Sequence, residues 1–163
     1  MGKIILLCGK ICSGKSHYAA QLTQKSPGVI LSCDEVMLDL NLDNLLQHVG
    51  DVHQTMTPKI KKYLSKKAVE IAAAGPNVIL EFGFWSRQER QEMTQYFKQK
   101  GLVVEWHYIH ISREDWVKNI ADRNLHAESG YFVDQGLLNK LNTLFEEPLP
   151  QEMDVWVENK REK

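Results

Sequence analysis

The chain has 163 residues, of which 43% are hydrophobic and 25% charged, and its formal net charge is −1. This length suits one compact domain with a core that needs no disulfides, and the near-neutral charge gives no general attraction to nucleic acid or anionic membrane. No apolar run approaches the ~20 residues of a membrane-spanning helix, and we expect no signal peptide. The cysteines, Cys8, Cys12 and Cys33, are odd in number and lack metal-ligand spacing, which predicts reduced thiols in a cytoplasmic protein.

Short apolar runs alternate with helical patterns in the first half of the chain. The predicted elements are a strand at about 3–8, a helix at about 14–24, a strand at 29–31 and a partly helical stretch over 35–49. Thr57-Pro58 predicts the start of the next helix, with Thr57 as N-cap and Pro58 at the first helical position. Gly75-Pro76 predicts its end.

The same alternation continues in the second half. The predicted elements are a strand at 77–82, a helix from 86 to 101, a strand at 102–111, a helix from 112 to about 124, a loop at 125–133, a helix marked by residues 137–145, a strand at 154–157 and a solvated tail from 159 to 163. Ser86 with Glu89, and Ser112 with Asp115, predict N-caps for two of these helices. Repeated strand–helix units indicate a single α/β domain over residues 1–163, with ligands bound beyond the carboxyl ends of parallel strands.

One segment matches the phosphate-binding pattern G-x-x-x-x-G-K-[ST] between a predicted strand and a predicted helix. Its residues are Gly9, Lys10, Ile11, Cys12, Ser13, Gly14, Lys15 and Ser16. Gly9 and Gly14 allow the close backbone approach that lets loop amides face phosphate oxygens. Lys15 is expected to reach the β- and γ-phosphates, and the Ser16 hydroxyl to bind Mg²⁺. The sequence therefore predicts ATP and Mg²⁺ as cofactors.

Two carboxylates follow or end predicted strands. Asp34 comes after the second strand, where a carboxylate can accept a proton from an attacking hydroxyl; the alternative is a helix N-cap. Glu81 ends the third strand, where an acid near Mg²⁺ is expected; the alternative is a partly exposed polar residue.

The segment after Glu81 supplies candidates for the acceptor side. Phe84 and Trp85 can flank an acceptor, although core packing is the favoured interpretation for each aromatic residue alone. Arg87 can meet an anionic group, and the alternative is a surface charge. Arg123 precedes a predicted lid and can neutralise charge on the transferred phosphoryl group. Arg113 is the alternative donor, and a surface ion pair is the alternative role for either arginine.

A basic stretch lies in the helix that we expect to begin at Thr57. Its lysines are Lys59, Lys61, Lys62, Lys66 and Lys67. The favoured interpretation is the solvated face of an amphipathic helix, because there is no aromatic interleaving or net positive charge; the alternative is contact with a polyanion such as RNA.

Together these segments resemble the small P-loop kinases of the zeta-toxin, chloramphenicol-phosphotransferase and polynucleotide-kinase type, including an uncharacterised bacterial branch known as AAA family ATPases. The resemblance covers nearly the whole chain. Beyond the phosphate loop it rests on residues 32–35, 81–87, 123–124 and 145–148. It implies a P-loop NTPase three-layer sandwich with a five-stranded parallel sheet of order 2-3-1-4-5, a short lid at about 124–134, Asp34 as the base and Arg123 as the lid arginine. Glu81 stands where Asp is frequent in that family, and residues 125–149 contain no second lid arginine.

The predicted activity is transfer of the γ-phosphoryl group of ATP to a hydroxyl of a small-molecule acceptor, without a membrane partner. One alternative is an ATP-binding or ATP-hydrolysing switch, or partner-binding module, with little transferase activity. A further alternative is a nucleic-acid 5′-end kinase, which the neutral charge disfavours.

Overall fold

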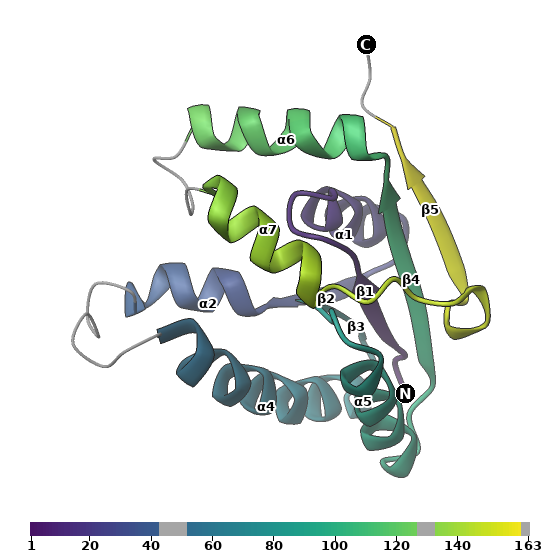
Figure 1. Ribbon diagram of the computed structural model, residues 1–163. Helices are drawn as coiled ribbons and strands as arrows, with labels where there is room; N and C mark the ends of the chain where they lie inside the picture. The colour runs from purple at the N-terminus through teal and green to yellow at the C-terminus, as the bar shows by residue number, and fades with distance from the viewer. Residues whose placement is uncertain (43–51, 127–132, 161–163) are drawn as a thin grey trace.

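The computed structural model describes residues 1–42, 52–126 and 133–160 (Figure 1). The elements are β1 Ile4–Cys8, α1 Lys15–Lys25, β2 Gly28–Ser32, α2 Cys33–Asp39, α4 Val52–Ala73, β3 Asn77–Gly83, α5 Arg87–Gln99, β4 Val104–Ile111, α6 Arg113–Leu125, α7 Gln135–Leu144, the 3-10 helix η2 Pro150–Glu152 and β5 Val155–Asn159. Among the described helices, none combines the length and hydropathy needed to cross a membrane.

Five strands pair in parallel in the order β2-β3-β1-β4-β5, which confirms the predicted fold class. β1 lies at the centre because all five of its residues are buried and apolar, as expected of a strand covered on both faces. Its side chains alternate between two cores. Ile4, Leu6 and Cys8 face one core, whereas Ile5 and Leu7 face the other.

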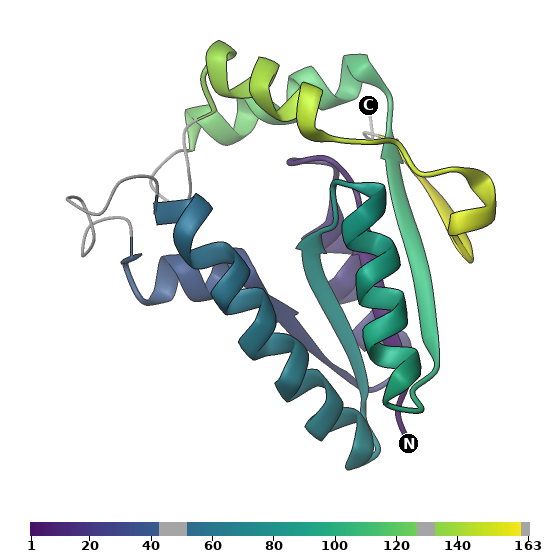
Figure 2. The ribbon, with the colours of Figure 1, turned by 60° about the horizontal axis from the view of Figure 1, so that its bottom comes forward.

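Helices cover both faces of the sheet. Ile60 and Leu64 of α4 and Phe97 of α5 pack into the larger core, and Figure 2 shows these two helices in front of the sheet. Ala19 of α1 packs into the second core on the opposite face. Because the strands are parallel, their carboxyl ends meet at one edge, and the segments that follow β1, β2 and β3 lie there together.

The predicted start of α4 at Thr57-Pro58 is wrong. The helix begins at Val52, and Pro58 lies inside it. A proline in this position removes one backbone hydrogen bond and crowds the carbonyl four residues earlier. Met56 nevertheless packs against the larger core, so burial of this side chain favours continuing the helix before the proline.

Other local predictions have mixed outcomes. The Ser86 and Ser112 hydroxyls accept hydrogen bonds from the Glu89 and Asp115 amides, each at 3.1 Å, which confirms both caps. The predicted solvated tail is wrong at its first residue, because Asn159 ends β5. Residues 43–49 of the partly helical stretch and 127–132 of the predicted lid lie outside the described residues.

Candidate functional site

A cleft of about 1580 Å³ opens beyond the carboxyl ends of β1 and β3. It is bounded by residues 11–16 after β1, by Asp34 of α2, by one face of α4, by the start of α5 and by parts of α6 and α7. Figure 2 shows α4 and α7 on opposite sides of this end of the sheet. The cleft therefore lies where ligands bind in parallel α/β sheets.

The phosphate loop runs from Gly9 to Ser16 between β1 and α1, as the sequence predicts. Gly14 has φ +97°, and a Cβ there would lie 2.3 Å from Asn159 Nδ2, so both conformation and space require glycine. Cys12 also adopts a left-handed conformation, with φ +57°. No side chain among the described residues caps α1 at Gly14, so the first amides of the helix remain available to an anion.

Three side-chain amide and indole groups hold three consecutive carbonyls of this loop. Trp116 Nε1 donates to Ile11 (2.6 Å), Asn119 Nδ2 to Cys12 (3.1 Å) and Asn159 Nδ2 to Ser13 (2.7 Å). We call Trp116, Asn119 and Asn159 the loop clamp. The sequence-based prediction missed all three; for the first two, their helical spacing with Arg123 was an available signal.

Lys15 lies within the loop that it is expected to serve. Its Nζ donates to the carbonyls of Gly9 (3.0 Å) and Lys10 (2.7 Å). Burial lowers the pKa of Lys15, whereas the charges of Glu81 and Asp34 raise it. Both carboxylates are thus within electrostatic reach of the Lys15 ammonium.

Glu81 of β3 and Ser16 at the start of α1 meet directly, since the Ser16 hydroxyl donates to Glu81 Oε1. Burial raises the pKa of Glu81, and the Ser16 hydrogen bond and the Lys15 charge oppose this shift. A hydroxyl and a carboxylate side by side are hard oxygen donors. They fit Mg²⁺, which takes few protein ligands and completes its shell with water and phosphate.

Asp34 is exposed and lines the cleft. The alternative prediction that Asp34 caps α2 is wrong, because Ser32 is the N-cap and its hydroxyl accepts from the Glu35 amide at 3.3 Å. Within the described part of the chain, the Asp34 carboxylate makes no hydrogen bond or ion pair. It is therefore available to a ligand in the cleft.

The structure separates Phe84 from Trp85. Phe84 is fully buried, and its ring packs edge-on against Trp106 at 4.9 Å between centroids. The predicted contact of Phe84 with an acceptor is thus corrected in favour of core packing, because φ +50° turns this side chain under the sheet edge. Trp85 is half-buried, lines the cleft and lies over Gly83, where a Cβ would be 2.7 Å from the indole nitrogen.

The two predicted arginines also differ in position. Arg87 does not line the cleft, which corrects its predicted contact with an acceptor: its Nε lies 3.8 Å from Glu152 Oε2, and its side chain is 49% exposed. Arg123 does line the cleft, and its Nη1 donates to Cys12 Sγ at 3.5 Å. Arg113, the alternative donor, lies outside the cleft lining.

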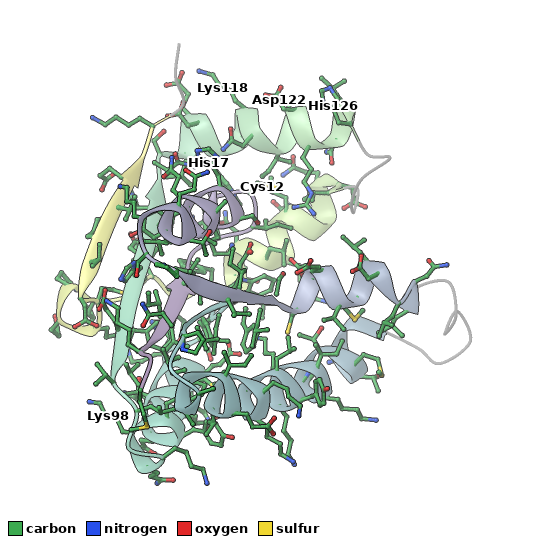
Figure 3. All side chains as sticks on the ribbon, turned by 180° about the vertical axis from the view of Figure 1, so that it is seen from behind. Cys12, His17, Lys98, Lys118, Asp122 and His126 are labelled. Carbon is green, nitrogen blue, oxygen red and sulfur yellow. The ribbon has the colours of Figure 1, made fainter. Side chains whose placement is uncertain are left out.

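One face of α6 carries Arg123 and two members of the loop clamp. Figure 3 shows Lys118, Asp122 and His126 pointing outward from this helix, which leaves the opposite face turned toward the phosphate loop. Asn124 then makes two hydrogen bonds with the backbone of Val133, each 2.8 Å long. These bonds join the two ends of the predicted lid.

Comparison with known proteins finds one family whose model covers most of the chain. The AAA_33 family, described as an AAA domain, matches residues 4–148. No curated protein matches the chain.

Solved structures of three kinases resemble the chain over nearly its whole length. A sugar kinase from Janibacter sp. has a TM-score of 0.67 at 16% identity, covering 97% of this chain and 86% of that one. The APS kinase of Mycobacterium tuberculosis has a TM-score of 0.67 at 16% identity, covering 99% and 90%. A gluconokinase from Sinorhizobium meliloti has a TM-score of 0.62 at 16% identity, covering 96% and 82%. At this identity the likeness shows the fold, and it confirms the predicted resemblance to small P-loop kinases.

Proposed function

Because the chain belongs to the AAA_33 family of AAA domains, we propose that it is an ATP-dependent phosphotransferase that moves the γ-phosphoryl group to a hydroxyl of a small molecule. The observation that supports this most is the exposed carboxylate of Asp34, which has no hydrogen-bond or ion-pair partner among the described residues and shares one cleft with Lys15 and Ser16 of the phosphate loop. The sugar kinase, APS kinase and gluconokinase with the same fold are all named for small acceptors.

The donor half of the site is the phosphate loop. Its amides and Lys15 would hold the phosphates of ATP. On binding, Lys15 would replace its hydrogen bonds to two loop carbonyls with hydrogen bonds to phosphate oxygens. Ser16 and Glu81 would hold Mg²⁺, which neutralises phosphate charge when bound. Arg123, beside Cys12, is placed to stabilise negative charge on the transferred group.

The acceptor half lies between α2 and the start of α5. The acceptor oxygen would form a bond to the γ-phosphorus while the bond from that phosphorus to the bridging oxygen of ADP breaks. The hydroxyl proton would pass to the Asp34 carboxylate, which acts as general base. Trp85, with Met93 and Tyr96 of α5, supplies a largely apolar wall against which the acceptor can pack.

Single-turnover transfer from γ-labelled ATP to a library of hydroxyl compounds tests this function. Asp34→Asn keeps the shape of the side chain but removes the base, so transfer should fall by about 10²–10⁴-fold with ATP affinity nearly unchanged. Asp39→Asn, at the far end of α2 and outside the cleft lining, is the matched control and should transfer normally. Transfer by Asp34→Asn at the wild-type rate would show that this carboxylate is not the base.

A second candidate, ATP binding or hydrolysis without transfer, is favoured by one observation. Residues 125–149 contain no arginine, so this segment supplies no second arginine to complete the charge at the transferred group. The same labelled ATP distinguishes the two functions: label released as inorganic phosphate in the presence of every acceptor would support hydrolysis, whereas labelled organic product supports transfer.

A further inference from the structure

The structure divides the basic stretch of α4 into two groups. Lys61, Lys62 and Lys66 line the cleft, together with Ser65 on the same face of the helix. Lys59 and Lys67 do not line the cleft, and Lys67 pairs with Glu70 at 2.7 Å. Lys59, Lys62 and Lys66 are exposed, as the favoured interpretation of a solvated face predicts, and the structure adds that three of the five lysines face the cleft.

This face of α4 lies next to the proposed base. α2 and α4 are in direct contact, and Met37 of α2 and Ile60 of α4 belong to the same core cluster. Asp34, three residues before Met37, and Lys61, one residue after Ile60, both line the cleft. An acceptor whose hydroxyl reaches Asp34 thus occupies the same cleft as the lysines of α4.

Two of these lysines have charges that no described residue neutralises through an ion pair. Lys61 forms an ion pair with Glu89 of α5. Lys62 and Lys66 are exposed and form no ion pair with any described residue. Besides Glu89, the acid of α5 that lines the cleft is Glu92, and its carboxylate accepts a hydrogen bond from Gln88 at 2.8 Å.

We propose that Lys62 and Lys66 bind a phosphate, sulfate or carboxylate group on the acceptor, while Trp85 and Tyr96 contact its less polar part. This inference rests on the proposed phosphotransferase function and specifies its substrate class. An anionic acceptor must approach the triphosphate of ATP, and cations beside its charged group offset that repulsion. Lysine suits this role because it binds anions as a point charge without fixed geometry.

A binding experiment tests the anion site without relying on catalysis. With the phosphate loop saturated by Mg²⁺ and AMPPNP, calorimetry at low ionic strength measures binding of phosphate, sulfate and acetate. The double variant Lys62→Gln/Lys66→Gln should weaken binding of at least one of these probes by about tenfold, since close opposite charges attract. Lys59→Gln/Lys67→Gln removes the same charge from the same helix and should bind like wild type. Equal weakening in both double variants, or no binding of any probe to wild type, would overturn the proposal.

A transfer experiment identifies the anionic group and separates this inference from the proposed function. Labelled ATP is offered with matched pairs: glycerol and glycerol 3-phosphate, ribose and ribose 5-phosphate, glucose and gluconate, and a 5′-hydroxyl oligonucleotide. We expect labelled product from at least one of the charged small molecules and not from the neutral compound paired with it. Lys62→Gln/Lys66→Gln should raise the KM for that charged acceptor about tenfold without changing the KM for ATP. Lys62→Arg/Lys66→Arg should restore the wild-type KM for the acceptor.

Product from neutral members as readily as from charged ones, or from the oligonucleotide alone, would overturn the inference while leaving phosphoryl transfer intact. Failure of all transfer, with probe binding still lost only in Lys62→Gln/Lys66→Gln, would contradict the phosphotransferase and keep the anion site.

Discussion

The loop clamp gives the phosphate loop a defined shape through three single side chains. Because the C=O and N–H of a peptide point in opposite directions, anchoring a carbonyl on the α6 and β5 side turns the following amide toward the cleft. Trp116 is also in contact with Lys10, whose Nζ lies 4.8 Å from the indole centroid. One indole therefore holds the loop by both a hydrogen bond and a cation–π contact.

Trp116→Phe separates these two contacts, since phenylalanine keeps the aromatic ring but lacks the N–H that reaches Ile11. We expect ATP affinity to fall by about fivefold to tenfold, the net worth of one buried hydrogen bond of about 1 kcal/mol. Nucleotide titration measures this. Trp156→Phe is the control, because it removes an indole that donates to Glu158 on the edge strand β5. This variant should leave ATP affinity unchanged.

At the scale of elements, Arg90 joins three segments that are distant in sequence. This residue of α5 is 2% exposed, and its Nη1 donates to the carbonyls of Phe84 (3.1 Å) and Glu146 (3.0 Å). Its Nε donates to Glu152 Oε1 at 3.1 Å. The turn that buries Phe84 and places Trp85 in the cleft lining is thus held by a buried guanidinium, which offsets the strain of a left-handed phenylalanine.

Arg90→Met removes these hydrogen bonds and leaves Glu152 without its buried ion-pair partner. We expect the free energy of unfolding to fall by about 3 kcal/mol, the cost of breaking a buried charged pair. Denaturant unfolding measures the change. Arg87→Met is a matched control on the same helix, facing the same carboxylate from a more exposed position, and a fall as large as that of Arg90→Met would contradict the role assigned to burial.

At the scale of the whole molecule, a polar chain crosses from α1 through β4 to the segment before β1. The Tyr18 hydroxyl contacts His107 Nδ1 at 2.8 Å, His107 Nε2 contacts Glu105 Oε1 at 2.6 Å, and Lys3 Nζ donates to Glu105 Oε2 at 2.6 Å. Burial raises the pKa of Glu105, but the hydrogen bonds and charges of Lys3 and His107 outweigh it, so that pKa lies below its usual value of 4.5.

This lowered pKa fixes the sign of a pH effect on stability. Glu105 contributes stability above its unfolded-state pKa, and that contribution is lost as pH falls through the lower folded-state pKa. Glu105→Gln should therefore unfold more easily than wild type at pH 7, with the difference shrinking as pH falls below about 4.5. Thermal unfolding at a series of pH values measures it. Glu70→Gln, in an exposed pair on α4, should show little difference at any pH, and a Glu105→Gln difference that persists undiminished at the lowest pH would contradict this sign.

The sequence by itself determined the elements whose signals are local. The phosphate loop is recognisable because glycine, lysine and serine at fixed spacing serve a backbone conformation within eight residues. The buried strands are recognisable from continuous apolar runs, and the caps at Ser86 and Ser112 from residues three apart. Parallel strand–helix units then place Asp34 just after one strand and Glu81 near the carboxyl end of its neighbour, and the resemblance to small P-loop kinases supplied the strand order.

Only the tertiary structure decided which side chains reach the cleft. Phe84 and Trp85 have similar sequence signals, and the left-handed backbone at Phe84 sends one to the core and the other to the cleft. Asn159 meets Ser13 across 146 residues of sequence, a contact that no local pattern encodes. The lysines of α4 look alike in sequence, and helix packing alone turns three of them toward the cleft. Local propensity is the same for these positions, and only packing between distant segments decides which side chain is buried and which lines the cleft. For this reason the phosphate loop could be predicted from sequence, whereas these side-chain positions around it could not.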